Sequence, residues 1–166
     1  MKAARWVFAA LLLAVVTQAL VYYPQLPERM ASHFGGAGQP NGWSSKASFF
    51  GLQTFVVVVA VACFACLPAW IQRLPARLIN LPNKEYWLAP ERRVQTMASV
   101  GAALTWFGCV VLAFILALTW LVIRFNLGRD PVLPGAGVGV LLGGFVVCVV
   151  LLIVRFLYLG RRPPLD

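Results

Sequence analysis

Residues 49–71 read FFGLQTFVVVVAVACFACLPAWI, a run without a single charged side chain. A helix of this length rises about 35 Å, which is enough to cross the roughly 30 Å hydrocarbon core of a bilayer. Three more apolar runs cover residues 6–23, 97–123 and 135–159. The sequence therefore predicts an all-α, polytopic integral membrane protein with about four transmembrane helices, in one membrane domain that covers residues 1–166.

The overall composition agrees with a bilayer environment. Hydrophobic residues make up 61% of the chain and charged residues 11%, with a mean hydropathy of +0.82, whereas soluble domains are about 25% charged. A net charge of +9 in a soluble protein would suggest nucleic-acid binding. Here the basic residues stand at the ends of the apolar runs, which is typical of membrane topology. We expect lipid around the chain and no nucleic-acid partner.

The basic residues also predict an orientation. Ten of them fall on the side that holds both termini and the connector 72–95, and four fall on the side of the connector 24–48. The positive-inside rule then places both termini and the connector 72–95 in the cytoplasm. The first run could instead be a signal peptide cleaved near Ala19, but its length and flanking aromatic residues favour a retained helix.

The cysteines lie inside the apolar runs. Cys63 and Cys66 form a C-x-x-C pair, a spacing that can indicate redox or metal chemistry. In mid-membrane, however, cysteine behaves as a small hydrophobic residue and a thiolate would be costly. We therefore expect neither a redox role nor a metal for this pair.

The connector 24–48 is the segment richest in polar and turn-forming residues. Pro27 and Glu28 suit the start of a short helix, and Gly35 suits its end. One or two helical turns would then present His33 just before a glycine-rich turn. The run Pro40-Asn41-Gly42 predicts a further turn.

The order and spacing of residues in this connector carry a family resemblance. The matching positions are Leu26, Pro27, His33, Phe34, Gly38, Pro40, Gly42, Trp43 and Lys46. The connector resembles the domain of unknown function 1648, found in SdpI-type immunity membrane proteins. The chain departs from that pattern at Ala31, Gly35 and Asn41, where the family usually has proline, asparagine and aspartate. Residues 81–93 also resemble the connector of bacterial members.

The resemblance implies a bacterial inner-membrane protein. In the best-understood relatives the role is immunity to a secreted toxic peptide, coupled to sequestering a transcriptional repressor. Those relatives have additional membrane helices after the shared domain, so this shorter chain matches only part of their architecture.

Several residues of the connector could contact a ligand or partner. His33 could act as a metal ligand, a proton-linked switch or a general base, although a metal site and a catalytic triad both need further groups. We favour a histidine that packs in the loop, with ligand or peptide contact next and catalysis last. Phe34 and Trp43 could anchor a partner or dip into the headgroup zone, and Lys46 could meet lipid phosphate, water or a ligand. No catalytic residue, metal or cofactor is expected.

Two other features predict contacts. Gly135, Gly139 and Gly143 stand four residues apart, which lets a second helix approach closely, within the chain or between chains. The basic connector 72–95 could bind a cytoplasmic protein, but we favour the simpler interpretation that it retains topology and touches anionic lipid.

These features together favour a non-enzymatic bacterial inner-membrane protein that acts in immunity or signal sensing through its outer connector. The alternative is a small accessory subunit of a transporter or another membrane complex. An enzyme ranks third, because no motif supplies an acid to orient His33.

Overall fold

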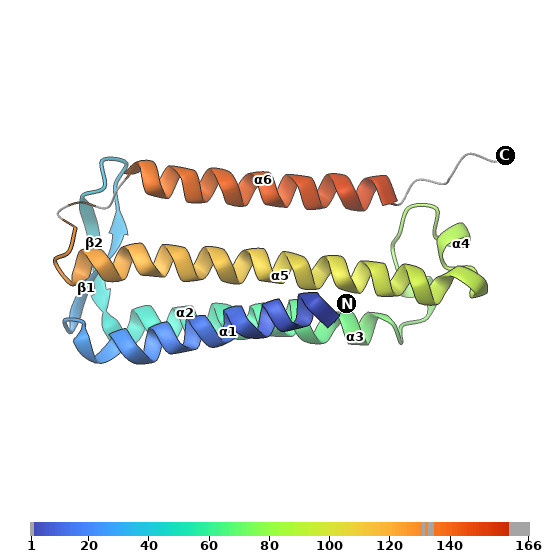
Figure 1. The fold of residues 1–166 in the computed structure, drawn as a ribbon, viewed down its shortest axis with the longest axis horizontal. Coiled ribbons are helices and arrows are strands. Elements are labelled where there is room, and N and C mark those ends of the chain that lie inside the picture. Colours follow the sequence, from blue (N-terminus) through green and yellow to red (C-terminus); the bar gives the residue numbers. More distant parts are fainter. Residues whose placement is uncertain (1, 131, 133–134, 160–166) are drawn as a thin grey trace.

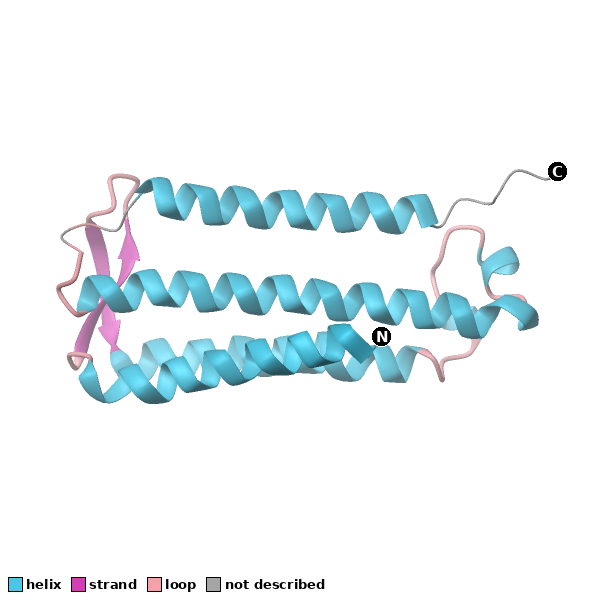
Figure 2. Ribbon diagram, in the orientation of Figure 1, coloured by secondary structure: helices cyan, strands magenta, loops and turns pink. Residues whose placement is uncertain are grey.

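The computed structural model describes residues 2–130, 132 and 135–159. Within this part of the chain, four helical segments are long and apolar enough to cross a membrane: Lys2–Gln25, Lys46–Ile71, Pro90–Asn126 and Gly135–Tyr158. They run side by side along the long axis of the molecule (Figure 1). The predicted all-α polytopic fold is confirmed, with one small β-hairpin added at an end of the bundle (Figure 2).

The elements follow one another in a simple up-and-down order. Helix α1 (Lys2–Tyr22) ends in a 3-10 turn, η1 (Tyr23–Gln25), before strands β1 (Arg29–Phe34) and β2 (Pro40–Ser45). The second span is composite: α2 (Lys46–Val61), a π-helical turn η2 (Ala62–Cys66) and α3 (Leu67–Ile71). The connector holds η3 (Ala76–Leu78) and α4 (Lys84–Trp87), and the last two spans are α5 (Pro90–Asn126) and α6 (Gly135–Leu159).

The two ends of the molecule differ in content. The start of α1, the connector and the end of α6 lie at one end, which we name the connector end, and the hairpin lies across the other, the hairpin end (Figure 1). This arrangement agrees with the expectation that the connectors 24–48 and 72–95 lie on opposite sides of the membrane.

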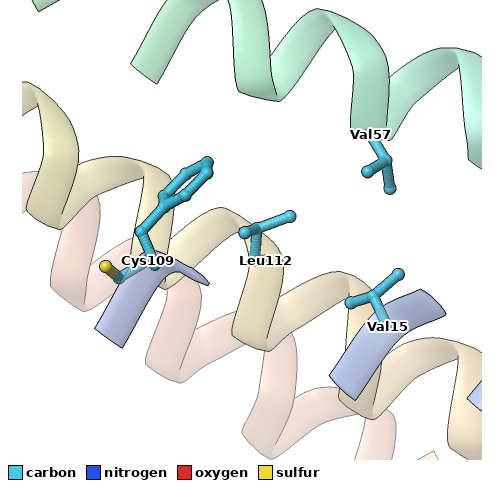
Figure 3. Close-up of a cluster of buried hydrophobic side chains, with 5 residues drawn as sticks. Val15, Val57, Cys109 and Leu112 are labelled. Carbon is cyan, nitrogen blue, oxygen red and sulfur yellow. The ribbon is translucent and has the colours of Figure 1, made fainter. Parts of the chain in front are cut away.

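Helix α5 forms the centre of the fold. It has 37 residues and therefore rises about 55 Å, well beyond the hydrocarbon thickness. It begins earlier than the predicted run, at Pro90, where proline loses no helical bond and Glu91 meets the positive end of the helix dipole. Helices α1 and α2 pack on it through one buried cluster (Figure 3), whose members are Phe8, Val15, Val57, Cys109 and Leu112.

A glycine permits the closest approach within the bundle. A Cβ atom on Gly108 would lie 2.4 Å from Cβ of Phe64 and 2.7 Å from Cε2 of Phe8. Real Cβ atoms do not make such contacts, so the absence of a side chain at this position allows α1 and the π turn to touch α5 together.

The π turn lies next to a proline. Pro68 has no N–H and cannot donate to the carbonyl of Phe64 four residues earlier. The hydroxyl oxygen of Thr105 on α5 lies 3.3 Å from that carbonyl oxygen and 3.0 Å from that of Gly101, and it can donate its one proton to either. Cys63 and Cys66 both lie on this turn as free cysteines.

Helix α6 is the least enclosed element. It packs along α5, with the rings of Phe114 and Phe145 4.6 Å apart, and none of its most apolar 18-residue window is buried. Cβ atoms on Gly139 and Gly143 would meet nothing within 4 Å. Gly139 and Gly143 therefore contact no second helix of the described chain, and helix packing between chains stays a prediction. A Cβ atom on Gly135 would lie 3.7 Å from the carbonyl oxygen of Gly36.

A candidate recognition site on the hairpin

The segment 24–48 folds as an antiparallel hairpin, so the predicted helical turns are wrong. Arg29 pairs with Ser45 and Phe34 with Pro40, with irregularities of register on either side of His33. The reversal occurs at residues 35–39, where Gly38 has φ of 75° and donates its N–H to the carbonyl of Gly35 at 2.9 Å. The expected turn at residues 40–42 is accordingly the start of β2.

The inner side of the hairpin packs on the ends of three helices. Met30 is fully buried and belongs to a second apolar cluster, which contains Leu26, Phe50, Val122 and Ile123. An extended β1 places Met30 in this cluster while its neighbour Arg29 remains exposed. Burial of this one large side chain stabilises the extended backbone by roughly 2 kcal/mol.

Asn126, the last residue of α5, fixes β1 to the bundle. Its Oδ1 accepts the N–H of Ala31 at 2.8 Å, and its Nδ2 donates to the carbonyl of Ala31 at 3.0 Å and to that of Val122 at 2.9 Å. A carboxamide offers one acceptor and two donors. The side chain therefore satisfies both backbone groups of Ala31 as a neighbouring strand would.

Lys46 holds the base of the hairpin rather than presenting a free cation. Its side chain is only 13% exposed, and its Nζ lies 2.9 Å from a carboxylate oxygen of Glu28. The same Nζ lies 3.4 Å from the carbonyl oxygen of Leu26 and 5.0 Å from the centroid of the Tyr23 ring. These contacts make Lys46 a structural residue.

The other motif residues divide into buried and exposed groups. The Phe34 ring packs edge-to-face on Phe125, with centroids 5.0 Å apart, while Gly38 is buried and Pro40 is half-buried. Gly42 lies against His33: a Cβ atom there would be 3.0 Å from the Cβ of His33. Only His33 and Trp43 of the predicted contact residues keep exposed side chains.

Arg29 joins Trp43 in what we call the hairpin surface, which comprises these two residues. His33 pairs with Gly42, the neighbour of Trp43 in β2, and therefore lies on the opposite face of the hairpin. The guanidinium carbon of Arg29 lies 6.0 Å from the centroid of the Trp43 ring, and Trp43 is 51% exposed. Sequence reasoning missed Arg29, because only the strand register reveals that it shares a face with Trp43. An arginine beside a tryptophan is typical of sites that recognise a partner.

The charges at the hairpin end leave an excess of positive groups. Both carboxylates there are paired: Glu28 with Lys46, and Asp130 with Arg124 through two hydrogen bonds of 2.7 and 3.0 Å. Arg29 forms no ion pair within the described part of the chain. Among the same residues, no three histidine, cysteine, aspartate or glutamate side chains gather as a metal would need.

At the connector end, two arginines of α5 contact neighbouring groups. Arg92 lies over the Tyr86 ring, 4.1 Å from its centroid, and pairs with Glu91 at 3.1 Å. Arg93 donates to the carbonyl of Leu74. These two cations therefore tie the connector to α5.

Comparison with known proteins identifies the region that contains the hairpin. Residues 9–57 match the family model described as Domain of unknown function (DUF1648). The predicted resemblance to this domain is confirmed. The matched region covers most of α1, the whole hairpin and α2 as far as Val57, so the hairpin is its central feature. No curated protein and no solved structure matches the chain.

Proposed function

We propose that the protein is a non-enzymatic bacterial inner-membrane protein whose hairpin recognises a peptide or protein outside the cytoplasm, in immunity or signal sensing. The observation that carries this proposal is the hairpin surface: the exposed side chains of Arg29 and Trp43 share one face of a hairpin that Asn126 and Lys46 hold to the helix ends. A hairpin held in one conformation loses less conformational entropy on binding. Arginine and tryptophan are frequent anchor residues of protein interfaces.

Orientation supports the outer placement of this surface. Ten basic residues belong to the segments predicted on the side of the connector end. Four belong to the segments predicted on the side of the hairpin. The positive-inside rule then places the connector end in the cytoplasm.

The surroundings of His33 favour recognition over catalysis. A general base of the triad type needs a carboxylate that orients the imidazole. The nearest acid in sequence, Glu28, pairs with Lys46 instead, and among the described residues Asp130 pairs with Arg124. His33 packs against Gly42 on the face opposite Trp43, so it supports the shape of the hairpin and has no catalytic partner among the described residues.

The test is complementation of a deletion strain. The strain is challenged with concentrated culture supernatants of related bacteria, and survival is compared between the native gene and variants. Trp43→Ala and Arg29→Ala should each lose protection while the protein remains at its normal level in the membrane, because both side chains are exposed. Gln39→Ala, also exposed but outside the hairpin surface, is the matched control. Full protection by both variants would contradict the proposal.

A second candidate function is an accessory subunit of a membrane complex. The observation that favours it is the open side of α6, where Gly139 and Gly143 face no other helix of the described chain. Such a face suits a transmembrane helix of another chain. In this case Gly139→Leu should release a stoichiometric partner that co-purifies with the native protein, while unchanged co-purification, or the lack of any partner, would exclude the role.

A further inference from the structure

The hydrogen-bond register of the hairpin shows which backbone groups point away from it. The N–H of Lys46 donates to the carbonyl of Glu28 at 2.9 Å, so residues 28 and 46 form a hydrogen-bonded pair. Hydrogen-bonded and non-hydrogen-bonded pairs alternate along an antiparallel ladder. Arg29 and Ser45 therefore form a non-bonded pair, and Ala31 and Trp43 form the next one. In such pairs the backbone groups of both residues point outward, away from the partner strand.

The outer edge of β1 is already occupied. The outward groups of Ala31 bond to the carboxamide of Asn126 at 2.8 and 3.0 Å. This agrees independently with the register, because a residue whose N–H and C=O both bond to Asn126 cannot use them on β2. The edge of β1 at this position is closed.

The outer edge of β2 is open. The N–H and C=O of Trp43 and the N–H of Ser45 point to this edge and bond to no described residue. Both residues are exposed. A free strand edge of this kind is a template for pairing with another extended chain.

We propose that an acidic, extended peptide segment binds as a third strand along the outer edge of β2, with Trp43 as its side-chain contact. This inference rests on the proposed function and names the class of partner and its mode of binding. Pairing would satisfy the free groups of Trp43 and Ser45, and side chains of the added strand would stand directly beside the Trp43 ring on the exposed face.

The charge of the partner follows from the ion pairs at the hairpin end. Glu28 and Asp130 are each engaged with a cation. Arg29 lies over Trp43 and forms no ion pair within the described residues. The uncompensated charge beside the open edge is positive, so a negatively charged strand fits and a basic one is repelled.

A single substitution can remove a donor from the open edge without touching the hairpin. Ser45 has φ of −67° and ψ of 149°, and proline prefers φ near −65°. Ser45→Pro therefore fits the backbone, leaves the bond from Lys46 to Glu28 in place and deletes an outward N–H. It also removes the hydroxyl that accepts the N–H of Ser48 at 3.0 Å. Ser45→Ala removes this cap alone and is the matched control.

The probe is a fluorescein-labelled octapeptide in which valine alternates with threonine and glutamate. Its binding to the full chain in lipid nanodiscs is followed by fluorescence anisotropy. We expect saturable binding that weakens about tenfold in Ser45→Pro, as the loss of one hydrogen bond implies. Binding should be unchanged in Ser45→Ala. A version with lysine in place of glutamate should bind more weakly, and a version methylated on alternate backbone nitrogens should not bind.

Equal binding to Ser45→Pro and Ser45→Ala would overturn the proposal, as would equal binding of the methylated peptide or no saturable binding of the acidic probe to the native chain. These results can be distinguished from a failure of the proposed function itself. If Trp43→Ala loses protection of cells while Ser45→Pro retains it, the hairpin recognises its partner through side chains on its face and the edge proposal alone fails.

Discussion

The side chain of Asn126 joins two parts of the chain that stand 95 residues apart. It uses its oxygen and both of its amide hydrogens in three hydrogen bonds, two of them to Ala31 and one to Val122. Aspartate lacks the donors and alanine lacks every polar group, so only a carboxamide of this length can serve all three. Ala31 is buried, which raises the cost of leaving its backbone groups without a partner.

Asn126→Ala should therefore loosen the hairpin at β1. Two buried backbone groups would lose their partner, at a cost of about 2 kcal/mol, which corresponds to an increase of about thirtyfold in local opening. Hydrogen exchange of the Ala31 amide, measured by mass spectrometry on the protein in detergent, checks this. The exposed Asn41→Ala should leave that exchange rate unchanged. If both variants exchange like the native protein, Asn126 does not hold the strand.

At the scale of single residues, the sequence predicted part of the site. His33 and Trp43 were identified by the family spacing, and both are exposed in the hairpin. Arg29 and Asn126 were not, because their roles depend on strand register and on a contact between distant residues, neither of which leaves a local pattern. Lys46 was predicted as a possible ligand contact, yet the nearby Glu28 and Tyr23 enclose it.

At the scale of elements, the hairpin shows how tertiary contacts override local signals. Pro27, Glu28 and Gly35 are good signals for the ends of a short helix. An isolated helix of two turns is unstable in water, however, because nucleation is costly. The extended form gains the burial of Met30 and the bonds to Asn126, and neither gain can be read from the segment alone.

The glycines of the helices differ in how closely other helices surround them. Their spacing in the sequence does not reveal which of them is enclosed. Gly108→Ala should destabilise the bundle by about 3 kcal/mol, because the new Cβ would lie 2.4 Å from Cβ of Phe64, an atom that cannot move without its helix. Gly139→Ala meets nothing within 4 Å and should leave the melting temperature in detergent unchanged or slightly raised. Similar losses in both variants would show that Gly139 is enclosed by another helix.

At the scale of the whole molecule, the apolar runs predicted the architecture well. The fourth run, 135–159, coincides with α6, and the composite second span ends at Ile71 as expected. Length and hydropathy suffice for this because a bilayer demands continuous apolar helices. How α6 packs could not be predicted, because lipid-facing and helix-facing surfaces are both apolar in a membrane.

The orientation predicts which end reacts with a reagent that cannot cross the membrane. In a chain whose four cysteines are replaced by alanine, Gln39→Cys in the hairpin should react with an impermeant maleimide in intact cells. Asn80→Cys at the connector end should react only after lysis. Both positions are exposed, so accessibility to solvent does not distinguish them. The reverse pattern would place the hairpin in the cytoplasm and contradict recognition of an outside partner.

The unbroken length of α5 gives the molecule the mechanics of a rod with a handle at each end. The hairpin is bonded to its last residue, Asn126, and the connector to its first turn through Arg93. A tilt of about 5° along a rod of about 55 Å moves the far end by about 5 Å, close to one helical pitch. A force on the hairpin would thus tilt α5 as a whole and move the connector at its other end. No series of side-chain rotations between the two ends is needed.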